Sequence, residues 1–202
     1  GLSDFYFSVN YLKEKIIDYF GNGKKWGVNI KYLIEESELG TAGSLSFFKE
    51  FNNAPILVMN GDVLTSFDFR NLIDFHIQNK LDSTISVREE TFQIPYGVVD
   101  VNGINLNSFH EKPIIKNLVN AGVYVLNELA ISVIKNNKYC DMPDLLKYLQ
   151  SIGKNVGVFP IHEYWIDQNV TNKVPDITSF NSNGQTVEYH SYKNGINNTL
   201  LL

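Results

Sequence analysis

The chain has 202 residues, of which 44% are hydrophobic and 19% are charged, and its net charge is -5. This composition is typical of a globular domain with a substantial core, and it lacks the basic excess of a nucleic-acid-binding protein. The single cysteine, Cys140, excludes an internal disulfide and a multi-cysteine metal site, and it is typical of a reducing cytoplasm. No segment approaches the roughly 18 apolar residues that span a bilayer. We therefore expect a cytoplasmic protein with no nucleic-acid or membrane partner.

Strand-like and helix-like segments alternate in the first part of the chain. Short apolar or β-branched runs predict strands at 4–10, 28–35, 55–60 and 83–89. Apolar residues at a helical period, or glycine turns that enter such a period, predict helices at 11–20, 39–51 and 69–79. This alternation predicts a mostly parallel sheet with helices on both faces, and the apolar run 55–60 predicts a strand covered on both sides.

The pattern changes in the second part. Asn102-Gly103 predicts a β-hairpin within 96–113, and further strands are expected at 118–127 and 155–161. A helix is expected over 141–153, with Asp141 as its N-cap. The polar segment after Asp167 has no clear period. We therefore expect a core domain at 1–168 and a polar tail at 169–202 that forms a loop or an appendage.

Two aspartates are candidates for chemistry. Asp62 follows Gly61 at the end of the apolar run "LVMN" (57–60), where open α/β sheets place their ligands. Asp167 follows Trp165 in a second, mostly apolar stretch. Both could be turn or cap residues, but Mg²⁺ is usually bound by one or two carboxylates together with substrate phosphates. His162 has no spaced partner and is interpreted as structural.

Two loops are candidates for ligand binding. In "EESELGTAGSL" (35–45), glycines directly before a helix would let a ligand approach the backbone and its amides, although a plain strand-to-helix turn has the same pattern. In "FHEKPIIKNLVNAGVYVLN" (109–127), a fixed Glu111-Lys112 pair could bind sugar hydroxyls and a phosphate. The alternative is a solvated ion pair that contributes about 0–1 kcal/mol.

Taken in order, several segments resemble the sugar-phosphate nucleotidyltransferase family, and most closely its mannose-1-phosphate guanylyltransferase-like branch. They are "VNYLKEKIIDYFGNGKKWGVNIKYLIEESELGTAGSL", "VMNGDVLTSFDF", "YGVV", "EKP", "VNAGVYVL" and "FPIHEYWID". The resemblance covers about residues 5–168. It implies a Rossmann-like three-layer αβα sandwich with a mostly parallel mixed sheet. It also implies transfer of a nucleotidyl group from a nucleoside triphosphate to a sugar 1-phosphate, with GTP favoured and uridylyl or thymidylyl transfer left open.

The resemblance also implies roles for individual residues. The nucleotide would be bound by Glu36, Leu39, Gly40, Thr41, Ala42 and Gly43. The sugar phosphate would be bound by Tyr96, Gly97, Glu111, Lys112, Asn120 and Gly122. Asp62 and Asp167 would hold Mg²⁺, and Asp62, Lys112 and Asp167 would be the catalytic residues.

The chain departs from the family pattern in two places. The family's opening strand and its G-x-G-x-R loop have no counterpart before Asp4, and Gln168-Asn169 replace the residues that usually follow the second aspartate. We therefore expect a core that lacks its first strand and loop. The alternatives are a non-catalytic nucleotide-sugar-binding protein, a truncated inactive member or a poorly folding remnant. An unpaired sheet edge would also favour a homo-oligomer.

Overall fold

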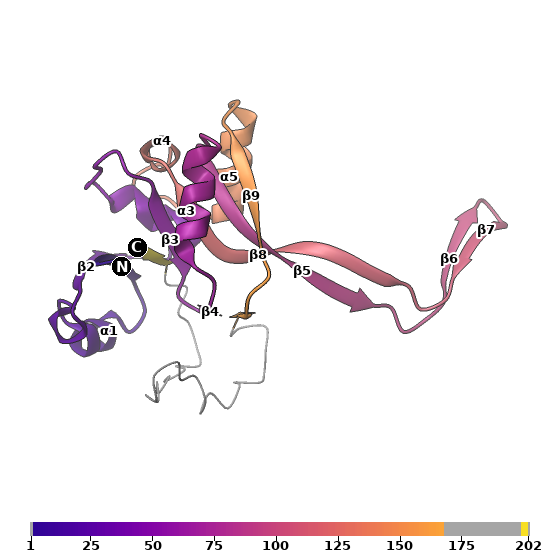
Figure 1. Ribbon diagram of the computed structural model, residues 1–202, viewed down its shortest axis with the longest axis horizontal. Helices are drawn as coiled ribbons and strands as arrows, with labels where there is room; N and C mark the ends of the chain where they lie inside the picture. The colour runs from indigo at the N-terminus through magenta and orange to yellow at the C-terminus, as the bar shows by residue number, and fades with distance from the viewer. Residues whose placement is uncertain (1, 168–198, 202) are drawn as a thin grey trace.

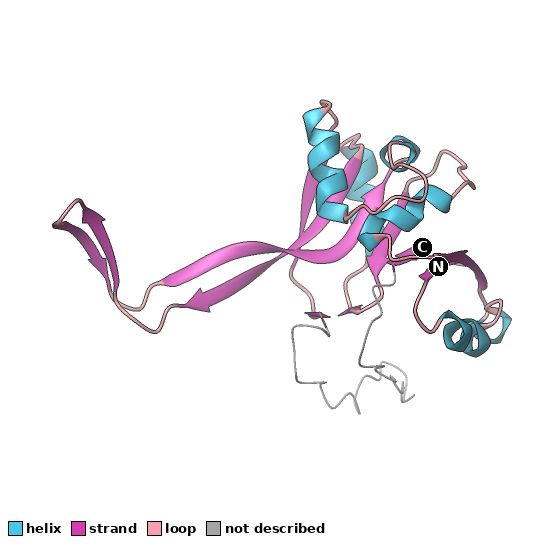
Figure 2. Ribbon diagram, turned by 180° about the vertical axis from the view of Figure 1, so that it is seen from behind, coloured by secondary structure: helices cyan, strands magenta, loops and turns pink. Residues whose placement is uncertain are grey.

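The computed structural model describes residues 2–167 and 199–201, and it has three layers, with helices on both faces of a central sheet (Figures 1 and 2). In chain order the elements are β1 (Asp4–Val9), α1 (Lys13–Phe20), the 3-10 helix η1 (Lys24–Trp26), β2 (Asn29–Ile34), α2 (Gly40–Gly43), the 3-10 helix η2 (Ser44–Phe47), β3 (Ile56–Asn60), β4 (Val63–Thr65), α3 (Phe69–Gln78), β5 (Ser83–Gln93), β6 (Val98–Asn102), β7 (Asn105–His110), β8 (Ile114–Leu126), α4 (Glu128–Ser132), α5 (Met142–Ser151), β9 (Val156–Ile161), β10 (Trp165–Asp167) and β11 (Thr199–Leu201). Among these elements, no helix has the length and apolar character needed to cross a membrane.

The main sheet has the strand order β2-β1-β11-β3-β8-β5-β9. Strands β1, β2, β3, β5 and β9 run in one direction, and only β8 and β11 run against them. The strand directions are therefore mostly parallel, as the sequence predicted. Because β8 and β11 each lie between two strands of the other direction, four of the six pairings are antiparallel.

The segment 169–202 was expected to be a loop or an appendage. Thr199–Leu201 instead form β11, which pairs with β1 on one side and with β3 on the other. A three-residue strand is too short to show a period in the sequence, so only pairing with its neighbours reveals it. The rest of this segment lies outside the described residues.

Two hydrophobic clusters lie on opposite faces of the sheet. Val58 and Tyr124 point into the first, which α4, α5 and the η2 region cover, whereas Leu57 and Val123 point into the second with Leu72 of α3. The prediction that strand 55–60 is covered on both faces is confirmed. The alternation arises because successive side chains of a strand point to opposite sides.

The expected helix at 39–51 is much shorter than predicted. The structure has a four-residue helix, α2, followed by the 3-10 helix η2, and Phe48 is extended. Glycines have a low helix propensity, and the amides of α2 form bonds to another part of the chain, which are described below. The sequence also missed β4, α4 and β10, since segments of three to five residues carry no clear period.

Strands β5 and β8 extend further than predicted and project from the body as a two-stranded ribbon (Figure 1). Their outer parts pair only with each other in the sheet, from Glu89 opposite Leu118 to Gln93 opposite Ile114. The β6–β7 hairpin continues beyond the ribbon, and its predicted turn at Asn102-Gly103 is confirmed, with Gly103 at φ +61°. We call the ribbon and hairpin together, residues 89–118, the arm.

His76 is a buried histidine of α3 that forms hydrogen bonds to the sheet strand β5 and to the residue after β8. Its side chain is 1% exposed, with Nδ1 2.8 Å from the Thr84 hydroxyl and Nε2 2.9 Å from Asn127 Oδ1. Burial lowers the pKa of the imidazole below its ordinary value of 6.5, and the bond to Asn127 opposes this effect. The folded state therefore favours the neutral ring.

This lowered pKa predicts a pH dependence of stability. The contribution of His76 is complete above about pH 6.5. It declines as the pH falls from there through the lowered folded-state pKa, because the unfolded chain then binds a proton that the folded chain does not. We expect urea unfolding at pH 7 and pH 5.5 to show a smaller loss of stability for His76→Gln than for the wild type. Equal losses in the two proteins would contradict the assignment.

Candidate functional site

Asp62 and Asp167 lie at the same end of the molecule. Asp62 lies in the turn between β3 and β4, at the carboxyl end of the parallel-running strands. Strand β10 pairs with β4, which places Asp167 opposite Val63, the residue that follows Asp62. The structure thus brings together the two aspartates that the sequence singled out, and both are partly buried.

The Asn120-Ala121-Gly122 segment of β8 packs against this corner. Gly122 has φ +71°, and a Cβ atom there would lie 2.8 Å from Val63 Cγ2 and 3.1 Å from Asn60 Nδ2. The Gly122 amide donates to Asn120 Oδ1 over 3.0 Å, and Trp165 Nε1 donates to the Ala121 carbonyl over 2.8 Å. Glycine is required at 122 by both the backbone angle and the space. Asn120 and Gly122 therefore share a corner with Asp62 and Asp167.

Tyr124 lies beneath this corner and was not recognised in the sequence, where it resembles any core residue of an apolar strand. Its side chain is 1% exposed, and its hydroxyl accepts from Asn120 Nδ2 over 2.7 Å. Burial raises the pKa of the phenol to about 12, and the negative charges of Asp62 and Asp141 act in the same direction. The phenol is therefore neutral at physiological pH and cannot serve there as a general base.

The corner has the ligand chemistry of a magnesium site. Asn60 Oδ1 is buried and has no hydrogen-bond partner among the residues that the structure describes. Together with Asp62 and Asp167, this atom forms a set of oxygen donors, which Mg²⁺ prefers. Within 2–167 and 199–201, no group of three or more His, Cys, Asp or Glu side chains could hold a metal. A metal here would thus take its remaining ligands from water or from a phosphate.

The loop before α2 is held by a buried carboxylate. Glu35 is 4% exposed and accepts hydrogen bonds from the Ser8 hydroxyl and, over 3.1 Å, from the Leu39 amide. Its neighbour Glu36, which the resemblance assigns to the nucleotide, is exposed at the same end of the sheet. The sequence signal for Glu35 was its position next to Glu36 at the end of a strand.

The Thr41, Ala42 and Gly43 amides of α2 are not available to an anion, contrary to the expectation for this helix. The Thr41 amide donates to Asp141 Oδ1 over 3.1 Å, and the Ala42 and Gly43 amides donate to the Cys140 carbonyl over 2.9 and 3.1 Å. Gly40 has φ +74°, and a Cβ atom there would lie 2.7 Å from both Asp141 Oδ1 and the Cys140 carbonyl oxygen. The glycines here allow close approach of the 140–141 segment.

Thr41 and Asp141 cap each other's helices. Asp141 occupies the N-cap position of α5, as predicted, but its carboxylate accepts from the Thr41 amide and makes no cap bond within α5. The Thr41 hydroxyl instead accepts from the Met142 amide over 2.8 Å, in the first turn of α5. The first turn of each helix is therefore capped by a side chain from the start of the other helix.

The remaining predicted residues lie elsewhere. Tyr96, Gly97, Glu111 and Lys112 lie where the ribbon joins the β6–β7 hairpin, and Gly97 packs against Glu111. Asn120 lies six positions after Ile114 along β8, which is about 20 Å of strand. The structure therefore does not bring this group together with Asp62 (Figure 1). The alternative reading of Glu111 and Lys112 as a solvated ion pair also fails, because no salt bridge joins them in the described part of the chain.

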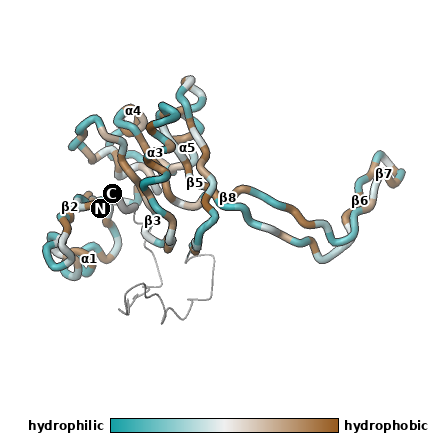
Figure 3. Tube along the Cα trace, in the orientation of Figure 1, coloured by the Kyte–Doolittle hydropathy of each residue, from teal (hydrophilic) through white to brown (hydrophobic). Residues whose placement is uncertain are grey.

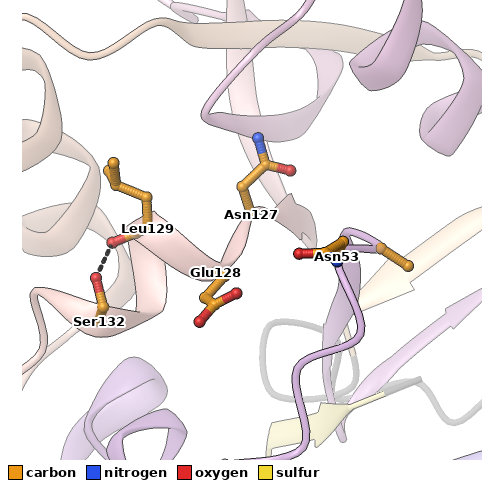
Figure 4. Close-up of a pocket in the computed structure, with 6 residues that line it drawn as sticks. Asn53, Asn127, Glu128, Leu129 and Ser132 are labelled. Carbon is orange, nitrogen blue, oxygen red and sulfur yellow. Dashed lines mark hydrogen bonds between the residues drawn. The ribbon is translucent and has the colours of Figure 1, made fainter.

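A surface hollow lies at the other end of the sheet (Figure 4). It is lined by Asn53, Ala54, Asn127, Glu128, Leu129 and Ser132. Ala54 precedes β3 and Asn127 follows β8, so the hollow lies at the opposite ends of these strands from Asp62. Asn127 bonds to His76 and to the Leu81 carbonyl, and the Ser132 hydroxyl bonds to the Leu129 carbonyl. These polar groups form hydrogen bonds within the protein, so we do not include the hollow in the candidate site.

Comparisons with known proteins identify the family and relatives of this chain. The family described as "Nucleotidyl transferase" matches residues 3–170. Mannose-1-phosphate guanyltransferases of Pichia angusta and Yarrowia lipolytica are 30% and 31% identical over 98% and 83% of this chain. The chain spans about half the length of these curated relatives, 58% and 48%.

Solved structures show the same fold. HddC from Yersinia pseudotuberculosis is 24% identical, with a TM-score of 0.61 over 83% of this chain and 73% of that one. The same protein complexed with GMP-PN has a TM-score of 0.56 at 22% identity, over 79% of this chain and 70% of that one. These likenesses support the Rossmann-like α/β architecture.

The exchange of caps between α2 and α5 predicts the effect of a side-chain substitution. We expect Thr41→Val to lower the free energy of unfolding by about 1–2 kcal/mol, because the Met142 amide loses its acceptor. Thr41→Ser keeps the hydroxyl and should stay within about 0.5 kcal/mol of the wild type. Chemical denaturation of the three proteins measures both values, and equal stability of the Val and Ser variants would refute the role of the hydroxyl.

Gly122 predicts a second effect, for which Gly103 is a matched control. Both glycines have positive φ, but a Cβ atom at Gly103 would meet nothing within 4 Å. We expect Gly103→Ala to cost about 1 kcal/mol through the backbone alone, and Gly122→Ala to cost about 1–3 kcal/mol more because of the contacts with Val63 and Asn60. Thermal and urea unfolding would measure this difference, and equal costs would show that the corner has room to relax.

Proposed function

Because the chain belongs to the nucleotidyl transferase family, we propose that it transfers a nucleotidyl group from a nucleoside triphosphate to a sugar 1-phosphate. The observation that carries the proposal is the corner at the carboxyl end of β3, within the matched region 3–170. There Asp62 follows the strand, Asp167 lies opposite Val63, and Asn60 packs against Gly122. Open α/β sheets bind their ligands at this end of the strands.

The proposed reaction is an in-line displacement. A phosphate oxygen of the sugar 1-phosphate forms a bond to the α-phosphorus of the triphosphate, and the bond to the pyrophosphate leaving group breaks. Such chemistry depends mainly on positioning and on neutralising charge. When bound, Mg²⁺ would neutralise part of the phosphate charge. Asp62 and Asp167 would hold it, assisted by the Asn60 amide oxygen.

Other residues would orient the substrates. We assign Glu36 and residues 39–43 to the nucleotide, with Glu35 holding the shape of their loop through the Leu39 amide. We assign Asn120 and Gly122 to the sugar-phosphate side of the corner. Tyr96, Gly97, Glu111 and Lys112 can join them only if the ribbon bends toward Asp62, and the register shift between Ile85 and Val87 is a suitable place for that bend.

Guanylyl transfer is the form of the reaction that we propose first. The relatives from Pichia angusta and Yarrowia lipolytica carry the name mannose-1-phosphate guanyltransferase, and HddC was solved with GMP-PN. We also propose a cytoplasmic location, which the single cysteine supports.

Two observations favour a second candidate, a protein that binds a nucleotide-sugar without turning it over. The α2 amides, which would suit a phosphate, donate to Cys140 and Asp141 instead. The arm residues Glu111 and Lys112 also lie away from the aspartates (Figure 1). This candidate predicts binding of a nucleotide-sugar without release of pyrophosphate.

An assay of pyrophosphate release tests the proposal. We expect Mg²⁺-dependent release from GTP with mannose 1-phosphate, and a loss of at least about 100-fold in Asp62→Asn, since metal binding contributes several kcal/mol. Asp74→Asn makes the same charge change on the exposed side of α3 and should keep full activity.

The outcomes separate the two candidates. No release with GTP, UTP or dTTP would overturn the transfer reaction. If calorimetry then shows GDP-mannose binding that Asp62→Asn weakens, the binding function stands. Release that does not depend on Asp62 would show that the corner is not the active site.

A further inference from the structure

The β6–β7 hairpin has one apolar face. Val99 lies opposite Phe109, and Val101 lies opposite Leu106, so the four side chains share one side of the hairpin. They are 50%, 56%, 61% and 66% exposed, respectively. We call these four residues the hairpin face. Ile104 extends the apolar surface at the turn and is fully exposed.

The opposite side of the hairpin is polar and forms its own hydrogen bonds. Asp100 lies opposite Ser108, and the Asp100 carboxylate accepts from Asn107 Nδ2. The Ser108 hydroxyl lies 3.2 Å from His110 Nε2. A ribbon that is polar on one side and apolar on the other is typical of a strand pair with one buried face. In this molecule, however, the apolar face is exposed.

Within residues 2–167 and 199–201, no helix or strand packs on the arm. Figures 1 and 2 show it projecting from the body, with no other described strand or helix against it, and Figure 3 shows apolar segments along its length. Phe92 and Ile115 lie opposite each other in the ribbon and are 54% and 42% exposed. An isolated two-stranded ribbon is at best marginally stable in water, so an arm of this length requires a partner.

We propose that the hairpin face is the interface of a dimer of this chain. Asp100 is the only charged residue between Val98 and His110, and its side chain lies on the polar side. The chain has a net charge of -5, so two copies repel each other over most of their surfaces. The uncharged face is where two copies can approach closely, and it offers no ion pair to a charged partner.

The exposed area is sufficient for such a contact. The five large apolar residues of the hairpin, Val99, Val101, Ile104, Leu106 and Phe109, are between 50% and 101% exposed. Their exposed surface is on the order of 500 Å², so a two-fold contact would bury about 1,000 Å² in total, the lower limit for a specific interface. In a two-fold dimer the same face meets itself, and two ribbons packed about 10 Å apart would form a small sandwich. This contact uses none of the residues assigned to substrates.

Adjacent residues on opposite sides of the hairpin provide the test. Leu106→Glu places a carboxylate on the hairpin face, and Asn105→Glu places the same charge one residue earlier, on the polar side. Both positions are exposed, so neither change should affect folding, and a thermal melt of each variant checks this. Sedimentation velocity of the full chain from about 1 to 100 µM would measure the dissociation constant of the dimer.

We expect a wild-type dimer, a dissociation constant raised at least about 100-fold in Leu106→Glu, and a change of less than about threefold in Asn105→Glu. A wild-type monomer at 100 µM would overturn the proposal. If Leu106→Glu also lowered the melting temperature of that monomer, the hairpin face would pack on its own chain. If Leu106→Glu left the melting temperature unchanged, the hairpin face would instead be available to bind a different protein. A dimer that both variants weaken equally, or that neither weakens, would also overturn it.

Discussion

The antiparallel pairing of β8 with β3 on one side and with β5 on the other is the interaction on which the rest of the structure depends. The last six residues of β8, Ala121–Leu126, are all buried. Apart from Gly122, they alternate between the two hydrophobic clusters. A fully buried valine or leucine contributes about 1.5–3 kcal/mol, so this segment is a large part of the core. The same strand begins in the arm and carries Asn120 and Gly122 through the corner beside Asp62 before it enters the core. The core, the candidate site and the arm are therefore connected through the single strand β8.

In the contact between Thr41 and Asp141, a side chain of the same chain takes the place that a bound anion could have at the start of α2. A glycine-rich turn before a helix is a common phosphate-binding geometry, but here the partner of the amides is the 140–141 segment of the same chain. The bonds join the first turns of α2 and α5, which are 100 residues apart. A nucleotide bound at this end of the sheet would therefore meet a loop whose shape is already set by protein contacts.

Charge is distributed unevenly over the molecule. Asp62, Asp167 and the buried Glu35 lie at one end of the sheet, so anionic phosphates would be repelled there without a cation. Along the ribbon, by contrast, Arg88 pairs with Glu90 and Lys116 pairs with Glu89. The hairpin beyond the ribbon is almost uncharged. The acidic corner thus suits a cation together with a polyphosphate, whereas the arm suits an apolar surface.

The sequence by itself determined the α/β class, the positions of the longer strands and helices, the hairpin turn at Asn102-Gly103, and the two aspartates at one end of the sheet. These features follow from local periods, turn residues and the rule that parallel strands end together, all of which are written in neighbouring residues. Only the tertiary structure decided that the Thr41 amide donates its hydrogen bond to Asp141, that Tyr124 lies beneath Asp62, and that Thr199–Leu201 form a strand of the sheet. It alone also decided that the arm separates Glu111 and Lys112 from the corner. Each of these depends on contacts between distant segments or on how far two strands stay paired, and neither a period nor a motif carries that information.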